Sequence, residues 1–196
     1  MNYLAHAYLS YNHPPVLVGN MISDFVKGKA QFRYERLIQV GIQLHRRIDT
    51  FTDDHPATRK AMEIFRPYYR RYSGAIMDVL YDHFLANDPA IFNEAHPLML
   101  FSEQTYAVLE EYTVQLPERF VVMLPYMKTQ NWLYNYQYRL GIERSLKGLV
   151  RRAAYLSDSA PAFALFNEHY SFLQQCYNEF IEDVKNHAKG ELGMLL

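Results

Sequence analysis

Apolar residues recur along this chain at intervals of three and four, the spacing of one face of an α-helix. Within residues 33–51, Leu37, Gly41, Leu44, Ile48 and Phe51 follow one another at steps of 4, 3, 4 and 3, which predicts a helix with one buried stripe. The same spacing predicts helices over residues 56–72, 74–87, 99–116, 118–136, 139–156 and 162–188. Strand-like alternation is scarce, and no internal repeat is visible. The pattern predicts an all-α fold, a single-domain bundle of seven or eight helices spanning residues 1–196.

Short polar segments predict where several of these helices begin and end. The run Thr52-Asp53-Asp54 precedes His55 and Pro56, and so offers capping side chains followed by a proline in the first helical turn. Segments 87–89 (Asn-Asp-Pro) and 157–161 (Ser-Asp-Ser-Ala-Pro) carry the same kind of signal. We therefore expect helix boundaries at these three places.

The composition is that of a packed protein, because 49% of the 196 residues are hydrophobic and 21% are charged. A single cysteine, Cys176, excludes an internal disulfide and a thiolate zinc site, and it favours a cytoplasmic location. The first residues lack a basic segment followed by a long apolar run, so we expect no signal peptide. No apolar stretch approaches the ~20 residues that span a bilayer, so we expect no membrane partner.

Charge is segregated along the chain although its sum is only −1. Residues 27–71 hold 11 basic and 5 acidic side chains, residues 72–118 hold 8 acidic and no basic ones, and residues 119–152 hold 7 basic and 1 acidic. The near-neutral total argues against a nucleic-acid partner. The two basic blocks can form a face for an acidic partner, or folding can neutralise one block against another.

Polar residues that share a helical face with apolar ones are the candidates for chemistry. His45 and Asp49 lie one turn apart and continue the face of Ile38 and Ile42. An imidazole and a carboxylate so placed can bind one metal ion, or the carboxylate can orient the imidazole. An ordinary surface pair has the same spacing, and the sequence alone leaves these alternatives open.

Two further segments carry a similar pattern. Asp78 and Asp82 lie one turn apart in an otherwise apolar helix, with His83 beside Asp82, and such charged groups need a metal ion or an arginine as partner. Asn20 and Asp24 share a face in the same way. His6 is a lone histidine in an apolar first helix, where a core position is the more common explanation.

Together these segments point to a divalent metal. Three helices each present carboxylate or imidazole groups, and oxygen with nitrogen ligands suits Mn²⁺, Mg²⁺ or Fe rather than a structural zinc. Side chains able to hold phosphate are interleaved with them: Lys27, Arg46, Arg47, Arg66, Arg70 and Arg71. A metal beside such cations indicates phosphoester hydrolysis, in which the ion polarises the phosphoryl oxygen and lowers the pKa of a bound water.

Four blocks of this sequence resemble the acyl carrier protein phosphodiesterase family. They are Met-Asn-Tyr-Leu-Ala-His at 1–6, Gly-Asn-Met-Ile-Ser-Asp-Phe-Val-Lys-Gly at 19–28, Gly-Ile-Gln-Leu-His-Arg-Arg-Ile-Asp-Thr-Phe-Thr-Asp at 41–53 and Asp-Val-Leu-Tyr-Asp-His-Phe-Leu at 78–85. The resemblance implies removal of 4'-phosphopantetheine from holo acyl carrier protein, with a divalent cation, commonly Mn²⁺ or Mg²⁺. It also implies a relation to the all-helical HD phosphohydrolases, although the chain carries only the reversed doublet Asp82-His83.

On this basis we expect a metal site drawn from Asp24, His45, Asp49, Asp82 and His83. Of these, Asp24, His45 and His83 are the expected catalytic residues. His6 and Asn20 are expected to bind or support the metal, and Asp78 to be structural. The expected phosphate contacts are Lys27, Arg46 and Arg47.

The expected partner is acyl carrier protein, which is small and acidic and would dock on a face drawn from residues 27–71 and 119–152. Two alternatives remain. One is an HD-like hydrolase of a nucleotide or other small phosphoester, which needs the metal site but not the second basic block. The other is a non-catalytic helical binding module, in which the histidines and aspartates only pair with arginines.

Overall fold

The computed structural model describes residues 1–196, and it contains helices and no strands. The α-helices are α1 (Tyr3–Tyr8), α2 (Pro14–Ile22), α3 (Arg36–Asp54), α4 (Pro56–Met62), α5 (Arg66–Tyr69), α6 (Ser73–Ala86), α7 (Leu98–Glu111), α8 (Glu118–Thr129), α9 (Trp132–Asn135), α10 (Arg139–Arg152), α11 (Ala160–Glu168) and α12 (Tyr170–Leu195). The 3₁₀ helices are η1 (Ser23–Phe25), η2 (Gly28–Arg33), η3 (Arg70–Tyr72) and η4 (Thr113–Gln115). The all-α prediction is confirmed, whereas the likeness to HD domains stays a prediction.

The expected count of seven or eight helices is wrong, because the predicted helices over 56–72, 118–136 and 162–188 are each divided. Arg70 has a φ of 48° after α5, and Asn131 has a φ of 41° between α8 and α9. Both angles lie in the left-handed region, which ends a right-handed helix. Residue His169 leaves the helical conformation between α11 and α12. Periodicity misses such breaks because the apolar spacing continues across them.

Two local predictions around α3 also need correction. Leu37, the first member of the predicted stripe, is 40% exposed, while Ile38 and Ile42 are buried in its place. The cap of α4 is His55 rather than the Thr-Asp-Asp run, because its Nδ1 accepts a hydrogen bond from the backbone N–H of Ala57 at 3.2 Å. The hydroxyl of Thr52 instead donates to the Ile48 carbonyl within α3.

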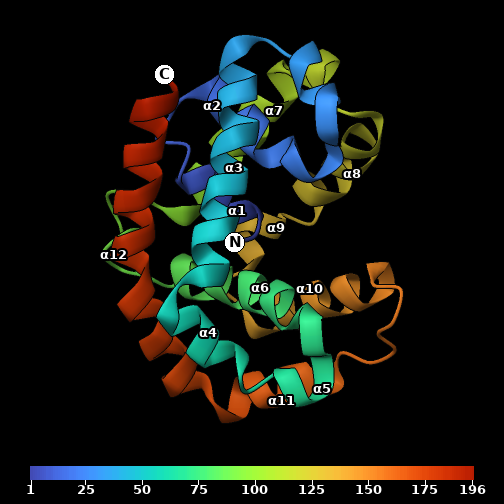
Figure 1. The fold of residues 1–196 in the computed structure, drawn as a ribbon, viewed down its shortest axis with the longest axis vertical. Helices are drawn as coiled ribbons and strands as arrows, with labels where there is room; N and C mark the ends of the chain where they lie inside the picture. Colours follow the sequence, from blue (N-terminus) through green and yellow to red (C-terminus); the bar gives the residue numbers. More distant parts are fainter.

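Figure 1 shows α12 running the length of the molecule beside α3 and α4, with which it is in contact. Helix α6 lies in the interior and touches α1, α4 and α10. The amino terminus lies in the middle of this view, against α3. None of the helices combines the length and apolar character needed to cross a membrane.

Helices α2 and α3 cross at very close range. A Cβ atom placed on Gly19 would lie 2.9 Å from the Cα of Gly41 and would collide with the Ile38 carbonyl. A Cβ atom on Gly41 would lie 2.8 Å from the backbone nitrogen of Asn20 and would collide with the Val16 carbonyl. The two backbones therefore touch without intervening side chains, which requires glycine on both helices.

We predict that Gly41→Ala lowers the free energy of unfolding by about 3 kcal/mol, because the added methyl must push α2 and α3 apart. Urea unfolding measures the change. The matched control is Gly190→Ala in α12, where a Cβ meets nothing within 4 Å; there we expect a gain of roughly 0.5–1 kcal/mol from helix propensity. Equal effects at the two positions would contradict the close crossing.

Candidate metal centre

Helices α1 and α3 bring two histidines and an aspartate together beside η1. His6 Nε2 lies 3.1 Å from Asp49 Oδ1, and His45 Nε2 lies 3.1 Å from Asp49 Oδ2. The two imidazole rings are stacked, with centroids 3.8 Å apart. One ligand atom from each of the three residues lies within 4.8 Å of the others. We call His6, His45 and Asp49 the histidine cluster.

Asp24, in η1, lies at the solvent side of the histidine cluster. Its Oδ1 is 3.5 Å from His45 Nε2, and its side chain is 72% exposed. Both histidines are buried, while the carboxylate of Asp49 is 40% exposed. The cluster therefore has a buried nitrogen side and an open carboxylate side, through which a ligand can enter.

Helix α2 sets the orientation of both histidines. His45 Nδ1 lies 2.7 Å from the Asn20 carbonyl, so Nδ1 donates there and Nε2 faces the carboxylates. The side-chain amide of Asn20 donates to the His6 carbonyl at 2.8 Å and to Ser10 Oγ at 3.1 Å. A backbone carbonyl that holds one imidazole nitrogen leaves the other as a lone-pair donor, which is the usual arrangement of metal-binding histidines.

Several buried polar atoms in this region lack a hydrogen-bond partner: His6 Nδ1, His45 Nε2 and Asn20 Oδ1. Burying such atoms without a partner costs free energy. A divalent cation beside the carboxylate of Asp49 would give His45 Nε2 a ligand bond in place of its close approach to the Asp24 and Asp49 carboxylates. The donor set therefore fits a metal ion bound by nitrogen and oxygen.

The charges of the cluster are strongly coupled. Burial and the neighbouring His45 lower the pKa of His6 to about 4, so that His6 is neutral. Burial opposes the positive charge of His45, but Asp24 and Asp49 outweigh it and raise the pKa of His45 to about 9. Burial likewise opposes the charge of Asp49, yet the Met1 ammonium group and the two histidines hold the pKa of Asp49 well below its usual range. Asp49 is therefore an anion able to bind a cation.

Two aspartates of α6 hold the start of α1 rather than joining the histidine cluster. Asp82 is fully buried and accepts hydrogen bonds from the backbone N–H groups of Leu4, Ala5 and Asn2 at 2.8, 3.2 and 3.3 Å. Burial raises the pKa of Asp82 to about 7, against the effect of these donors. The carboxylate completes the first turn of α1 in the manner of a helix cap.

Asp78 binds the α-ammonium group of Met1, which lies 2.6 Å from its Oδ1 and 3.4 Å from Asp49 Oδ1. Burial lowers the pKa of this ammonium group, but Asp78 and Asp49 outweigh it and raise the pKa to about 11. The carbonyl of Met1 lies 3.1 Å from His6 Nε2. Asp78 thus fixes the residue that contacts one of the clustered histidines.

His83 is placed apart from the histidine cluster. Its Nδ1 lies 2.7 Å from the Tyr136 carbonyl and its Nε2 lies 3.1 Å from the Tyr170 hydroxyl. Burial lowers its pKa. Both ring nitrogens are engaged by neighbours, and the fold does not bring His83 or Asp82 together with His45 and Asp49.

The three expected phosphate contacts differ in their surroundings. Arg46 donates to Gln31 Oε1 and to the Val26 carbonyl, both at 3.0 Å, and so holds the segment around η1 and η2. Arg47 forms an ion pair with Glu191 of α12. Lys27 is exposed and has no ion pair. Of the three, only Arg47 has an acidic partner, and only Lys27 is both exposed and without an ion pair.

The sequence predicts that His6 binds or supports the metal, and the structure puts its ring directly against Asp49 and His45. No spacing signal links position 6 to α3, because the contact is tertiary.

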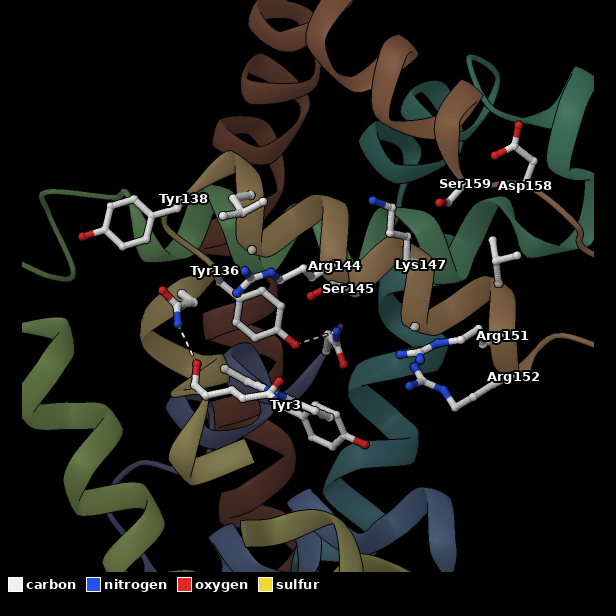
Figure 2. Close-up of a pocket in the computed structure, with 18 of the residues that line it drawn as sticks. Tyr3, Tyr136, Tyr138, Arg144, Ser145, Lys147, Arg151, Arg152, Asp158 and Ser159 are labelled. Atoms are coloured by element: carbon white, nitrogen blue, oxygen red, sulfur yellow. Dashed lines mark hydrogen bonds between the residues drawn. The ribbon is translucent and has the colours of Figure 1, made fainter. Parts of the chain in front are cut away.

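The sequence pattern also assigned no role to the aromatic run around Trp132. That run borders a cavity of about 900 Å³ between α1, α9 and α10, which we call the α10 cavity (Figure 2).

Comparison with known proteins gives a consistent picture. Residues 1–184 match the family described as acyl carrier protein phosphodiesterase. The chain is 32% identical over 180 residues to the acyl carrier protein phosphodiesterase of Photorhabdus laumondii, covering 92% of this chain and 91% of the relative. It is 32% identical over 191 residues to that of an Enterobacter species, covering 97% and 99%. No solved structure matches the chain significantly.

We predict that Asp82→Ala lowers the free energy of unfolding by about 3 kcal/mol, because three buried N–H groups of α1 lose their acceptor. Asp82→Asn keeps one carbonyl oxygen and should cost about 1 kcal/mol. Urea unfolding measures the free energy of unfolding of both variants. The control is Asp54→Ala, which removes an exposed ion pair with Arg59 and should change that free energy by about 0.5 kcal/mol or less. Loss of Mn²⁺ affinity in Asp82→Asn at unchanged stability would instead make Asp82 a ligand.

Proposed function

Because this chain belongs to the acyl carrier protein phosphodiesterase family, we propose that it hydrolyses the phosphodiester that joins 4'-phosphopantetheine to a serine of acyl carrier protein. The products are apo acyl carrier protein and 4'-phosphopantetheine. The structural observation that carries the proposal is the histidine cluster, in which two buried imidazole nitrogens each lie 3.1 Å from one anionic carboxylate. A cytoplasmic location for the reaction remains a prediction from the sequence.

We propose that His6, His45 and Asp49 hold a divalent cation, with Asp24 beside it. Mixed nitrogen and oxygen donors suit Mn²⁺ in particular, and Mg²⁺ or Fe²⁺ as alternatives. When bound, the cation would polarise a phosphoryl oxygen and lower the pKa of a water molecule. The stacked histidines and the Asn20 carbonyl hold the ligand atoms in place before any cation arrives.

The side chains around the proposed cation site have separate roles in the reaction. Asp24, the most exposed carboxylate of the group, is placed to orient the attacking water and to accept its proton. The water oxygen bonds to phosphorus as the bond from phosphorus to the serine oxygen breaks. The serine oxygen takes up a proton from solvent, which balances the proton that the attacking water gives to Asp24. Lys27, exposed and unpaired, is placed to contact a phosphate oxygen. We assign no step to His83, because both of its nitrogens are engaged elsewhere.

The structure also bears on where an acidic partner would dock. On α10, Arg144, Arg151 and Arg152 make no ion pair with an acidic side chain. The first basic block reaches the same region, because the Arg71 guanidinium lies 5.1 Å from the centre of the Tyr155 ring, just beyond α10. We propose that this surface receives acyl carrier protein, since unpaired cations attract an acidic protein.

We predict that incubation of holo acyl carrier protein with this protein and Mn²⁺ removes the prosthetic arm. Mass spectrometry should show the mass of the carrier protein fall by the mass of that arm. Prior removal of divalent metal with EDTA should abolish the reaction, and added Mn²⁺ should restore it. Asp49→Ala should lower the rate about 10³-fold or more, because the cation loses its central carboxylate. Asp54→Ala, an exposed aspartate of the same helix, is the matched control and should be active.

The same assay separates the rival functions. A small phosphodiester hydrolysed while holo acyl carrier protein is left intact would make the protein a hydrolase of small phosphoesters. Absence of any hydrolysis, together with no binding of Mn²⁺ by calorimetry, would leave a non-catalytic module.

We predict that the reaction with holo acyl carrier protein slows as salt rises, because screening weakens attraction between the α10 surface and the acidic partner. Between ~0.05 and ~0.5 M NaCl, we expect kcat/KM to fall by about tenfold, mainly through association. Steady-state kinetics at a fixed Mn²⁺ concentration measures this. A value of kcat/KM that does not change with salt would contradict electrostatic docking.

A further inference from the structure

The α10 cavity adjoins the start of α1, the segment that also reaches the histidine cluster. Its volume of about 900 Å³ is that of a site for a small organic molecule. Tyr3, Trp132 and Tyr136 supply aromatic walls, and α10 supplies much of the remaining wall. The Asn2 side-chain amide donates to the Tyr136 hydroxyl at 2.9 Å, which ties α1 to the opposite wall (Figure 2).

The cavity and the histidine cluster share α1 as a common wall. Asn2 and Tyr3 line the cavity, while Met1 contacts Asp49 and His6 in the cluster. Asp24 and the residues of the histidine cluster do not line the cavity themselves, so a bound molecule would have to pass Tyr3 to bring its phosphate to the cluster.

Cations stand on one side of this cavity. Figure 2 shows Arg151 and Arg152 extending from α10 toward Tyr3, and Arg144 extending toward Tyr136. None of the three arginines has an acidic partner. Unpaired guanidinium groups at the end nearest α1 suit a phosphate, because they can donate two parallel hydrogen bonds to its oxygens.

The rest of the lining combines apolar side chains, amides and hydroxyls, among them Trp132, Asn135 and Ser145, with the charged side chains of Lys147 and Asp158. A pantetheine chain has the same alternation, because a branched apolar segment is followed by two amides. A phosphate with a long, uncharged amide chain therefore matches both the cationic end and the polar-aromatic wall.

We propose, resting on the function proposed above, that the α10 cavity binds the 4'-phosphopantetheine arm, with Arg151 and Arg152 near the phosphate and the chain running along α10 between Trp132, Tyr136 and Gly148. The folded part of acyl carrier protein stays outside the α10 cavity. The arm is thereby fixed on one side of the phosphodiester, which leaves the serine oxygen on the other side as the leaving group.

Binding can be measured without turnover, because Trp132 is the only tryptophan in the chain. Titration of the metal-free protein with 4'-phosphopantetheine should change the intrinsic fluorescence in a saturable way. Pantetheine, which lacks the phosphate, should bind about tenfold more weakly. In the double variant Arg151→Gln with Arg152→Gln, the two compounds should bind equally, whereas inorganic phosphate alone should leave the fluorescence of the wild-type protein unchanged.

Filling the cavity tests the path of the arm. A Cβ on Gly148 meets nothing nearer than the end of the Arg152 side chain at 3.6 Å, so Gly148→Phe should fold and block the chain. We expect the fluorescence response to disappear and kcat/KM for holo acyl carrier protein to fall by at least about tenfold, with Mn²⁺ affinity unchanged. Gly190→Phe in α12, also in open space, is the matched control and should behave as the wild-type protein.

Ser145→Leu is a second blocking variant, with the same expected losses, should Gly148→Phe unfold. Normal turnover and normal fluorescence titration in a folded blocking variant would overturn the cavity assignment while leaving the hydrolase function intact. Saturable binding to the wild-type protein that is lost in the blocked variants would support the cavity assignment. If such binding occurs but the carrier protein is not hydrolysed, only the proposed function fails. Absence of any fluorescence response in the wild-type protein, with hydrolysis present, would also overturn the assignment.

Discussion

The contact on which the site depends is the crossing of α2 and α3 at Gly19 and Gly41. Packed helices are usually held 8–10 Å apart by their side chains, but here the two backbones touch. Asn20 directly follows one glycine, and His45 lies one turn after the other. The close crossing therefore brings the Asn20 carbonyl within 2.7 Å of His45 Nδ1, and this bond turns the opposite nitrogen toward Asp49.

Helix α1 needs a different anchor, because it is only six residues long. Short helices are marginal without tertiary support. Asp82 supplies that support through the backbone N–H groups of the first turn, and Asp78 does so through the Met1 ammonium group. Buried charges are costly unless they are paired and hydrogen-bonded, and here each carboxylate meets donors from one short segment. The two aspartates thus place His6, although neither lies in the histidine cluster.

The charged blocks of the sequence have two different surroundings in the fold. Part of it is neutralised inside the fold, since Arg47 pairs with Glu191 and the aspartates of α6 pair with the start of the chain. The arginines of α10 find no such partners. Both basic blocks therefore keep cations without acidic partners, and those of α10 line the α10 cavity.

Local interactions let the sequence determine the all-α class, most helix positions and the pairing of His45 with Asp49, because a helical repeat fixes which residues lie one turn apart. The four sequence blocks likewise determined the family. Tertiary structure alone decided that His6 joins the cluster, that Asp82 caps α1 and that His83 binds Tyr136, since these contacts join residues 43, 78 and 53 positions apart. By sequence alone, Asp82 and His83 are as good candidates for metal ligands as His45 and Asp49, because residue type and spacing do not report which neighbour satisfies a buried charge. The packing of α1 against α6 gives Asp82 its partners, and the packing of Tyr136 and Tyr170 against α6 gives His83 its own.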